Sequence, residues 1–452
     1  MRLRKTITTI VATAILLAGW QLFAVIANQP ELIPSLPRLV RTLCEWLVSG
    51  SFYQSVGATI LRGVLGMSIS FVCAIGMAGL FARFEWVYEL FRPLLAIMRS
   101  IPVISFILLA LIFLNPESIP LMIAFLTMFP LLTENLTRGI LDLRPGLSIM
   151  ARQFHIRRSN VLFQIIYPQL KPFLYSGLAS AAGFGWRAII MGEVLSQCAF
   201  GIGSEMKRAQ NFIAVPELLV WTIVAVFISF FFDKGISKVA DITPKISFAN
   251  EDQTIPTPTL SVLDTKDISY QYGIQHFSHS FQKGIIYGIS APSGKGKTTL
   301  LNLIGGILLP TEGEIHPTRH FGIATIFQQP QLLPHLTAEE NIILPLSSFL
   351  TEEKARRIAQ KHLQEMEMEP FGNRYPKELS YGQQQRIAIA RALAYPSPLL
   401  LMDEPFKGLD EALSHRIIER IREKQMKEER IILFTSHNPD EIRLLADEVI
   451  YL

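Results

Sequence analysis

The sequence predicts a multidomain protein, in which an all-α polytopic membrane domain of about six helices is followed by an α/β domain. Charged residues make up 18% of the 452 residues, against about 25% in soluble proteins. Long apolar runs fill the first half of the chain, at the length that a membrane-crossing helix needs. After residue 260, short β-branched runs alternate with charged amphipathic stretches, which is typical of a parallel sheet covered by helices.

Six apolar segments are long enough, at about 20 residues, to cross a bilayer as helices. They are residues 6–27, 58–82, 93–114, 117–137, 172–194 and 214–232. The first follows a basic start and could be a signal peptide that is cleaved at Ala27. Its 22 uncharged residues exceed the ~7–15 of a signal-peptide core, so we expect an uncleaved first span.

Basic residues indicate how the chain is oriented, because Lys and Arg favour the cytoplasmic side of a membrane. Three of the first five residues are basic, six basic residues lie in 138–171, and Lys234 and Lys238 follow the last span. The N-terminus and everything after residue 233 are therefore expected in the cytoplasm. The net charge of +4 is small, and we interpret it as loop charge on the inner face of the membrane, with membrane lipid and no nucleic acid as partner.

A polar stretch separates the two halves of the chain. Residues 240–259 contain three prolines and no helical period, which is typical of a linker. The expected domains are a transmembrane domain at 1–239, the linker at 240–259 and an α/β domain at 260–452.

A glycine-rich loop follows the apolar run 285–289 and predicts a phosphate-binding P-loop. Its glycines let the backbone amides approach phosphate oxygens at a helix N-terminus. Lys297 is expected to reach the β- and γ-phosphates, and the Thr298 hydroxyl to hold Mg²⁺. Ala291 stands where the strict pattern has its first glycine. The predicted nucleotide-binding residues in this loop are Ala291, Pro292, Ser293, Gly294, Lys295, Gly296, Lys297, Thr298 and Thr299.

Two acidic residues end a second apolar run, Leu399–Met402. Four apolar residues in a row are typical of a buried parallel strand. Asp403 at its end is expected to contact Mg²⁺, and Glu404 to act as the general base on the attacking water. A strand that ends in two acids is common, and the P-loop earlier in the chain is what favours this interpretation.

The segment LSYGQQQR, Leu379–Arg386, resembles the signature motif of ABC transporter ATPases, with Tyr381 in place of the usual glycine. The resemblance implies that this motif contacts ATP bound by a partner subunit. The motif residues concerned are Leu379, Ser380, Tyr381, Gly382 and Gln383. The α/β half is thus identified as a P-loop ABC ATPase domain.

Further residues match this family in the expected order. By resemblance, Tyr272 stacks on adenine and Gln328 senses Mg²⁺ while facing the membrane domain. Asp410, in Gly408-Leu409-Asp410, contacts the partner subunit. His437 contacts the γ-phosphate. The resemblance therefore implies ATP and Mg²⁺ as cofactors, with Thr298, Gln328 and Asp403 at the metal.

Members of this family hold ATP between two ATPase domains. One chain carries one such domain, so the resemblance implies a homodimer with two equivalent sites. Because Glu404, His437 and Lys297 are all present, we expect active sites with these three residues as the catalytic groups.

Residues 149–177 resemble the cytoplasmic loop of binding-protein-dependent importers. Ala151 and Arg152 fit the family pattern, His155 replaces its glycine, and Pro168 falls at the expected spacing. The resemblance implies a coupling helix that sits in a groove of the ATPase near Gln328. The alternative is a basic loop held by anionic lipid.

A second resemblance in the membrane half concerns Trp186, Glu193, residues 201–203 and residues 32–37. It is to the permeases for nitrate, sulfonates, taurine and thiamine precursors. An intramembrane acid such as Glu193 suggests a transport path, but a structural partner such as Arg187, or simple exposure at the membrane interface, would also explain it.

The sequence therefore predicts an ATP-driven importer of a small solute in the inner membrane of a bacterium, supplied by an extracytoplasmic substrate-binding protein. An exporter, or an ATPase that signals across the membrane without transport, stays open as the alternative. A soluble P-loop kinase is disfavoured by the spans and by the signature motif.

Overall fold

The computed structural model describes residues 2–240, 244–253, 260–271, 273–292, 294–317 and 322–452. It divides into two compact units, which we describe separately. The helical unit contains Met1–Leu143 and Gln169–Thr243, and the α/β unit contains Arg144–Pro168 and Pro244–Leu452. The predicted fold class, a helical membrane domain followed by an α/β ATPase fold, is confirmed.

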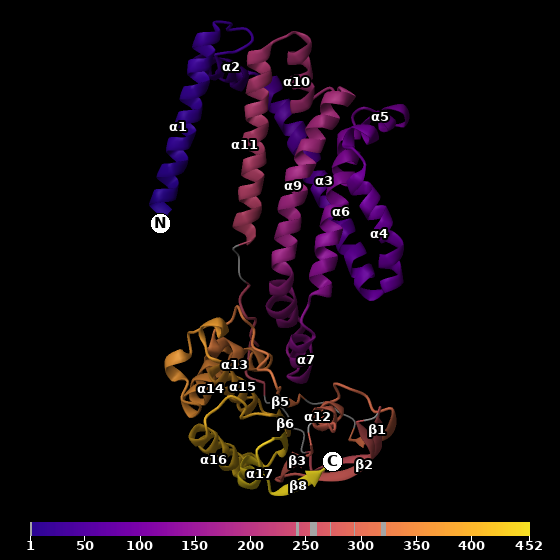
Figure 1. Ribbon diagram of the computed structural model, residues 1–452, viewed down its shortest axis with the longest axis vertical. Helices are drawn as coiled ribbons and strands as arrows, with labels where there is room; N and C mark the ends of the chain where they lie inside the picture. The colour runs from indigo at the N-terminus through magenta and orange to yellow at the C-terminus, as the bar shows by residue number, and fades with distance from the viewer. Residues whose placement is uncertain (1, 241–243, 254–259, 272, 293, 318–321) are drawn as a thin grey trace. The chain divides into compact units, whose positions relative to one another are not determined.

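The helical unit consists of helices of very different length (Figure 1). They are α1 (Arg2–Ala27), α2 (Leu36–Val48), α3 (Gly50–Arg83), α4 (Glu85–Ser100), α5 (Val103–Phe113), α6 (Ile119–Leu141), α9 (Tyr167–Ser196), α10 (Ile202–Asn211) and α11 (Val215–Ala240). Among the described residues, four helical stretches are long and apolar enough to cross a membrane: α3, α6, Arg158–Ser196 and Val215–Val239. The pair α4 and α5 would make a fifth.

The third expected span, 93–114, is not one straight helix. Helices α4 and α5 meet at a bend of 95°. Ile101, between them, adopts an extended conformation, because Pro102 disfavours the helical region for the residue before it. The first expected span lies within α1, whose described apolar part, Val11–Ala27, is shorter than a full span.

Small residues bring α3 and α6 together. A Cβ placed on Gly66 of α3 would lie 2.6 Å from the Cβ of Ala124 on α6. Such close approach through small residues is how helices associate in lipid, where burial of apolar surface gives no driving force. Gly76 on the same helix has nothing within 4 Å of its Cβ position.

A buried carboxylate connects α9 to α3 and α10. Glu193 is fully buried and accepts hydrogen bonds from Thr59 Oγ1 (2.9 Å), Arg62 Nη1 (2.8 Å) and the Gly203 amide (2.9 Å). Arg62 also pairs with Glu117 at 2.7 Å. The partner of Glu193 is therefore Arg62 and not Arg187, and this set of bonds gives the carboxylate a structural role.

The α/β unit is built around a parallel sheet in the order β5-β6-β7-β3-β8, next to an antiparallel sheet in the order β2-β1-β4. The strands are β1 (Val262–Tyr270), β2 (Ile274–Gln282), β3 (Ile286–Ser290), β4 (Glu312–His316), β5 (Ala324–Ile326), β6 (Leu399–Asp403), β7 (Ile431–Thr435) and β8 (Glu448–Tyr451). The register pairs Asp403 with Thr435 and Thr435 with Ile289. The carboxyl ends of β3, β6 and β7 therefore meet at one edge.

Helices lie on and beside this sheet (Figure 1). They are α12 (Lys297–Ile304), α13 (Ala338–Leu346), α14 (Glu352–Glu365), α15 (Tyr381–Ala394), α16 (Glu411–Glu428) and α17 (Pro439–Leu445). Strands β6 and β7 are buried at every position, as expected for central parallel strands.

One helix of the α/β unit comes from the middle of the membrane half of the sequence. Helix α7 (Pro145–Gln153) places Leu147, Met150 and Phe154 in the same apolar cluster as the ATPase core. His155 ends it with φ +47°, and Ile156 N donates to Ala151 O at 2.9 Å. This is a helix C-cap that usually takes glycine, which explains why the family pattern has glycine at that position.

Candidate active site

The loop between β3 and α12 has the backbone of a phosphate-binding site. Gly294 and Gly296 have φ values of +80° and +89°, where other residues are strained. A Cβ on Gly296 would also lie 2.6 Å from Gly273 O, so only glycine fits there. The loop leads into the N-terminus of α12, whose free amides favour an anion. Ser293, predicted here, lies outside the described residues.

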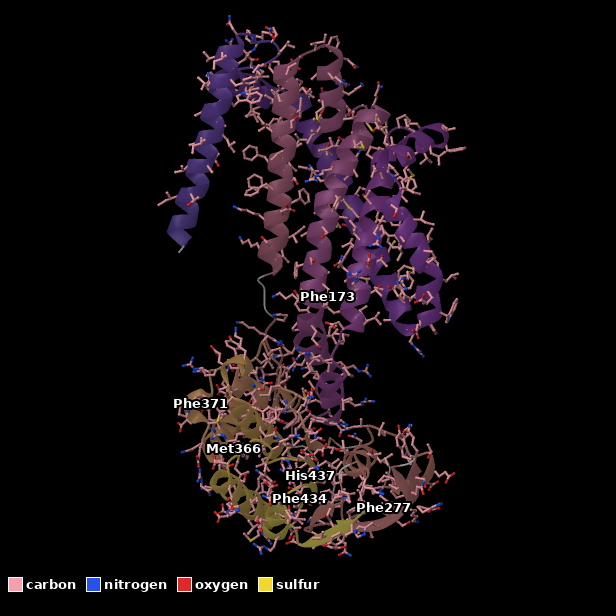
Figure 2. All side chains as sticks on the ribbon, in the orientation of Figure 1. Phe173, Phe277, Met366, Phe371, Phe434 and His437 are labelled. Carbon is pink, nitrogen blue, oxygen red and sulfur yellow. The ribbon has the colours of Figure 1, made fainter. Side chains whose placement is uncertain are left out.

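Lys297 points back across this loop. Its side chain is 8% exposed, and Nζ donates to Ala291 O at 2.7 Å. Nζ also lies 3.5 Å from Nδ1 of His437, which follows β7 (Figure 2). The loop lysine and the histidine are 140 residues apart in the sequence, and the fold brings them together at the strand ends.

Asp403 and Thr298 form an oxygen-rich site beside the loop. Thr298 Oγ1 donates to Asp403 Oδ2 at 2.9 Å, and Thr435 Oγ1 donates to Asp403 Oδ1 at 2.8 Å. Burial raises the pKa of Asp403, and the hydrogen bonds from Thr435 and Thr298 partly oppose this. Gln328 lines the same cavity of about 270 Å³ as Thr298 and Asp403.

This donor set fits Mg²⁺. The ion prefers hard oxygen ligands, and it keeps several waters, so one carboxylate, one hydroxyl and one amide oxygen suffice with the substrate phosphates. A cation here would also stabilise the charge of a carboxylate that burial alone disfavours.

Glu404 is surrounded by groups that favour its charged form. Its Oε1 accepts from Gln328 Nε2 at 3.3 Å and lies 3.2 Å from His437 Nε2. Its Oε2 lies 3.1 Å from Lys407 Nζ. Burial alone would raise the pKa of Glu404, but the hydrogen bonds from Lys407 and Gln328 and the nearby charges outweigh it and lower the pKa. The carboxylate is therefore ionised at neutral pH, the form that a general base needs before it takes a proton.

The signature motif forms the start of α15. Ser380 is the N-cap: its Oγ accepts from the Gln383 amide at 3.3 Å, and Gln383 Oε1 accepts from the Ser380 amide at 2.9 Å. This capping box fixes the helix N-terminus. Ser380 and Tyr381 are exposed, Gly382 and Gln383 are half-buried, and Leu379 is packed into the core.

Tyr381 makes contacts that a glycine could not make. Its Oη donates to Gln328 O at 2.8 Å. Its ring lies so close to Gly408 that a Cβ there would be 2.8 Å from Tyr381 Cδ1. The motif, the loop of Gln328 and the loop before Asp410 thus touch within one chain. Asp410 itself caps α16, accepting from the Leu413 amide at 2.9 Å.

The remaining predicted nucleotide-binding residues lie in or beside the loop. Lys295 N donates to Pro292 O at 3.3 Å, and Thr299 is in the first turn of α12. Tyr272, predicted to stack on adenine, lies outside the described residues.

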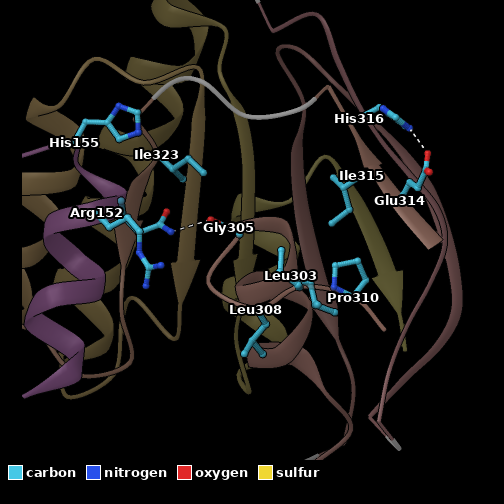
Figure 3. Close-up of a pocket in the computed structure, with 13 residues that line it drawn as sticks. Arg152, His155, Leu303, Gly305, Leu308, Pro310, Glu314, Ile315, His316 and Ile323 are labelled. Carbon is cyan, nitrogen blue, oxygen red and sulfur yellow. Dashed lines mark hydrogen bonds and ion pairs between the residues drawn. The ribbon is translucent and has the colours of Figure 1, made fainter. Parts of the chain in front are cut away.

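The predicted coupling segment is seated on the ATPase. Gln153 Nε2 donates to Gly305 O at 2.8 Å, and Ile323 N donates to Gln153 O at 2.7 Å. Arg152 and His155 line a cavity of about 590 Å³ there (Figure 3), away from the phosphate loop. Ala151 is buried in the core, and Pro168 lies in the first turn of α9.

The same segment also reaches the oxygen-rich site. Gly146 and Ile149 line the 270 Å³ cavity together with Thr298, Gln328 and Asp403. A Cβ on Gly146 would lie 2.5 Å from Oε1 of Gln331. The coupling segment and the residues predicted to hold the metal therefore line one cavity.

Sequence reasoning missed three residues at or near the site: Thr435, Lys407 and Arg391. Thr435 could have been found, because it is a hydroxyl at the end of an apolar strand. Lys407, three residues after Glu404, belongs to no motif that the sequence shows. Arg391 is fully buried on α15, and nothing in the alanine-rich sequence of that helix indicated a role for it.

Comparison with known proteins gives matches in both halves. Residues 274–407 match the family described as "ABC transporter", and residues 68–233 match "Binding-protein-dependent transport system inner membrane component". The Fe(3+) ions import ATP-binding protein of Rhizobium etli is 35% identical over 189 residues, which are 40% of this chain and 54% of that protein.

Other relatives match over most of their own length. The thiamine import ATP-binding protein of Yersinia pseudotuberculosis is 34% identical over 205 residues, 42% of this chain and 86% of that protein. A solved structure, the dimeric ATP-binding cassette MJ0796 bound to ADP and Pi, is 32% identical in sequence, with a TM-score of 0.40. The match covers 42% of this chain and 94% of that chain. The chain spans about half the length of the iron and glucose import relatives.

Proposed function

Because this chain belongs to the ABC transporter family and joins a binding-protein-dependent permease to an ATP-binding cassette, we propose that it hydrolyses ATP to import a small solute. One observation carries this proposal. The coupling segment contributes Gly146 and Ile149 to the cavity that also contains Thr298, Gln328 and Asp403. A rearrangement of this cavity when phosphate binds or leaves would therefore move the coupling segment. The two ends of that segment continue along the chain into α6 and α9.

The chemistry follows from the residues at the strand ends. Lys297 and the amides of the P-loop hold the β- and γ-phosphates. Thr298 and Asp403, with Gln328 nearby, would hold Mg²⁺, which would neutralise charge on those phosphates. Glu404 accepts the proton of the attacking water, and His437, 3.2 Å from it, contacts the γ-phosphate.

The active form is a homodimer in this proposal. Each chain has one P-loop and one signature motif, and Ser380 and Tyr381 at the N-terminus of α15 are exposed. A helix N-terminus favours phosphate, so Ser380 and Gly382 of one copy would contact the nucleotide of the other. ATP then favours the closed dimer because only that form makes both sets of contacts.

The direction and the solute rest on the permease half. The family matched by residues 68–233 is binding-protein-dependent, so we propose uptake across the inner membrane of a bacterium, with an extracytoplasmic receptor. The solute proposed is a sulfonate, nitrate, taurine or a thiamine precursor, from the resemblance at Trp186, Glu193 and residues 201–203.

The test is Glu404→Gln in the purified full-length chain. The variant should bind Mg-ATP normally and lose turnover by about 10²-fold or more, because general-base catalysis contributes at least that much. Glu423→Gln, an exposed acid on α16, is the matched control and should turn over at the normal rate. Unchanged hydrolysis in Glu404→Gln would contradict the proposal.

Transport assays separate import from the alternatives. Uptake that requires a separate solute receptor supports the importer. Solute accumulation in inside-out vesicles without any receptor would favour an exporter. Hydrolysis that responds to neither solute nor receptor would favour an ATPase that signals across the membrane.

A further inference from the structure

We propose that Arg391 is a positioning residue that joins the coupling segment to the signature helix α15 and to the loop after Gln328, through its contact with Phe154. This inference rests on the proposed function. It assigns a role to two residues that neither the motifs nor the catalytic chemistry uses.

The guanidinium of Arg391 is at the meeting point of three segments. Arg391 belongs to α15 and is 1% exposed. Its Nη1 donates to Gln331 O at 2.8 Å, and its Nη2 donates to Pro330 O at 2.9 Å. Its Cζ lies 5.4 Å from the centre of the Phe154 ring, at the end of α7. One planar group thus contacts the signature helix, the loop and the coupling segment.

Burying this charge is costly, and no acid compensates it. In the described part of the chain, no carboxylate lies within ion-pair distance of Arg391. Burial lowers its pKa to about 10, so the group stays charged at neutral pH. Two carbonyls and an aromatic face stabilise it. An apolar side chain of similar volume would be cheaper to bury at this position, so stability alone does not account for an arginine.

The loop that Arg391 holds is also held at its other end by α15. Tyr381 Oη donates to Gln328 O at 2.8 Å, and Gln328 Nε2 in turn contacts Glu404. Helix α15 and residues 328–331 are therefore fastened at two points and should shift as one piece. The coupling segment contacts this piece through the stacking of the charged Arg391 guanidinium on the Phe154 ring.

The core around Phe154 offers a matched control. Phe154 and Phe349 both present their rings edge-on to Tyr395, with centroids 5.2 Å and 5.9 Å apart. Both are buried in the same apolar cluster. In the contacts found between described residues, Arg391 stacks on Phe154 and not on Phe349. Replacing either ring by leucine removes similar packing, but only one replacement removes the stacking partner.

The experiment measures hydrogen exchange of the full-length chain in lipid nanodiscs, with and without Mg²⁺ and a non-hydrolysable ATP analogue. In the wild type, the nucleotide should change the exchange rate of amides in residues 145–156 by at least about twofold. Phe154→Leu should abolish that change while keeping the nucleotide affinity within about twofold. Phe349→Leu should respond as the wild type does.

A second variant tests the inference independently, in case Phe154→Leu fails to fold. Arg391→Lys keeps the charge but cannot reach both carbonyls, so it should also lose the response at 145–156. A normal response in Phe154→Leu or Arg391→Lys overturns the inference, and so does an equal loss in Phe349→Leu. A wild-type chain that binds no Mg-nucleotide would instead remove the proposed function, and this inference with it.

Discussion

Tyr381 illustrates how a single side chain changes the surroundings of the candidate active site. The glycine usual at this position could make neither the hydrogen bond to Gln328 O nor the contact with Gly408. The phenol therefore connects the motif that would face the partner's nucleotide with the loop that faces the chain's own metal site. Its ring remains 41% exposed, where a second copy can reach it.

We expect Tyr381→Phe to lower the maximal ATPase rate by about fivefold, because one neutral hydrogen bond contributes about 1 kcal/mol. The Michaelis constant for ATP should change little, since the phenol does not belong to the P-loop. Steady-state phosphate release measures both quantities. Tyr451→Phe, at an exposed tyrosine on β8, should behave as the wild type. An unchanged maximal rate in Tyr381→Phe would show that the bond has no part in turnover.

The residues that sequence could predict are those whose chemistry is local. The P-loop, Asp403 and Glu404 each follow an apolar strand, so their place at the sheet edge follows from the chain itself. The contacts of Arg391 with Phe154, and of Arg62 with Glu193, join segments far apart in the chain. The sequence around each residue does not specify which distant segment its side chain will contact. These two pairs could therefore be identified only from the folded structure.

Helices of the helical unit are held by close approach at glycine. On α3, Gly66 faces Ala124 of α6, whereas Gly76 faces open space. Hydropathy alone predicted the apolar runs, but it could not tell these two glycines apart. Hydropathy also predicted one span at 93–114, where Pro102 separates two helices. The proline was the feature of the sequence from which this break could have been predicted.

We expect Gly66→Leu to destabilise the helical unit, because forcing extra carbons into a packed contact costs about 1–3 kcal/mol. Gly76→Leu, on the same helix, should be nearly neutral. Thermal unfolding of the purified chain in detergent compares the two variants. Equal melting temperatures would show that α3 and α6 can separate at Gly66 without loss.

The whole molecule is divided in a way that the linear order of domains does not suggest. Residues 144–168 lie between two long apolar helices in the sequence, yet they belong to the α/β unit. The resemblance predicted a coupling helix on the ATPase. The segment concerned packs into the ATPase core, with Leu147, Met150 and Phe154 in one cluster with α13 and α15, and its coupling role stays a prediction.

We expect Met150→Asp to destabilise the ATPase fold by about 3 kcal/mol or more, because a carboxylate would replace a buried apolar side chain. Ser148→Asp, two residues away on the exposed face of α7, should leave it unchanged. Limited proteolysis of residues 260–452 in the full-length chain reports on this fold. If both variants resist protease as the wild type does, α7 only rests on the ATPase surface.

The division of the α/β unit between two stretches of sequence has a consequence for biosynthesis. Residues 144–168 leave the ribosome before α9 and α11 and before any strand of their own unit exists. Their apolar face stays exposed until the strands and helices that cover it have been translated. Exposed apolar surface of this kind is what chaperones and proteases recognise. A product that terminates early after α11 keeps that face uncovered, so we expect the cell to discard incomplete chains and retain those in which translation reached the end.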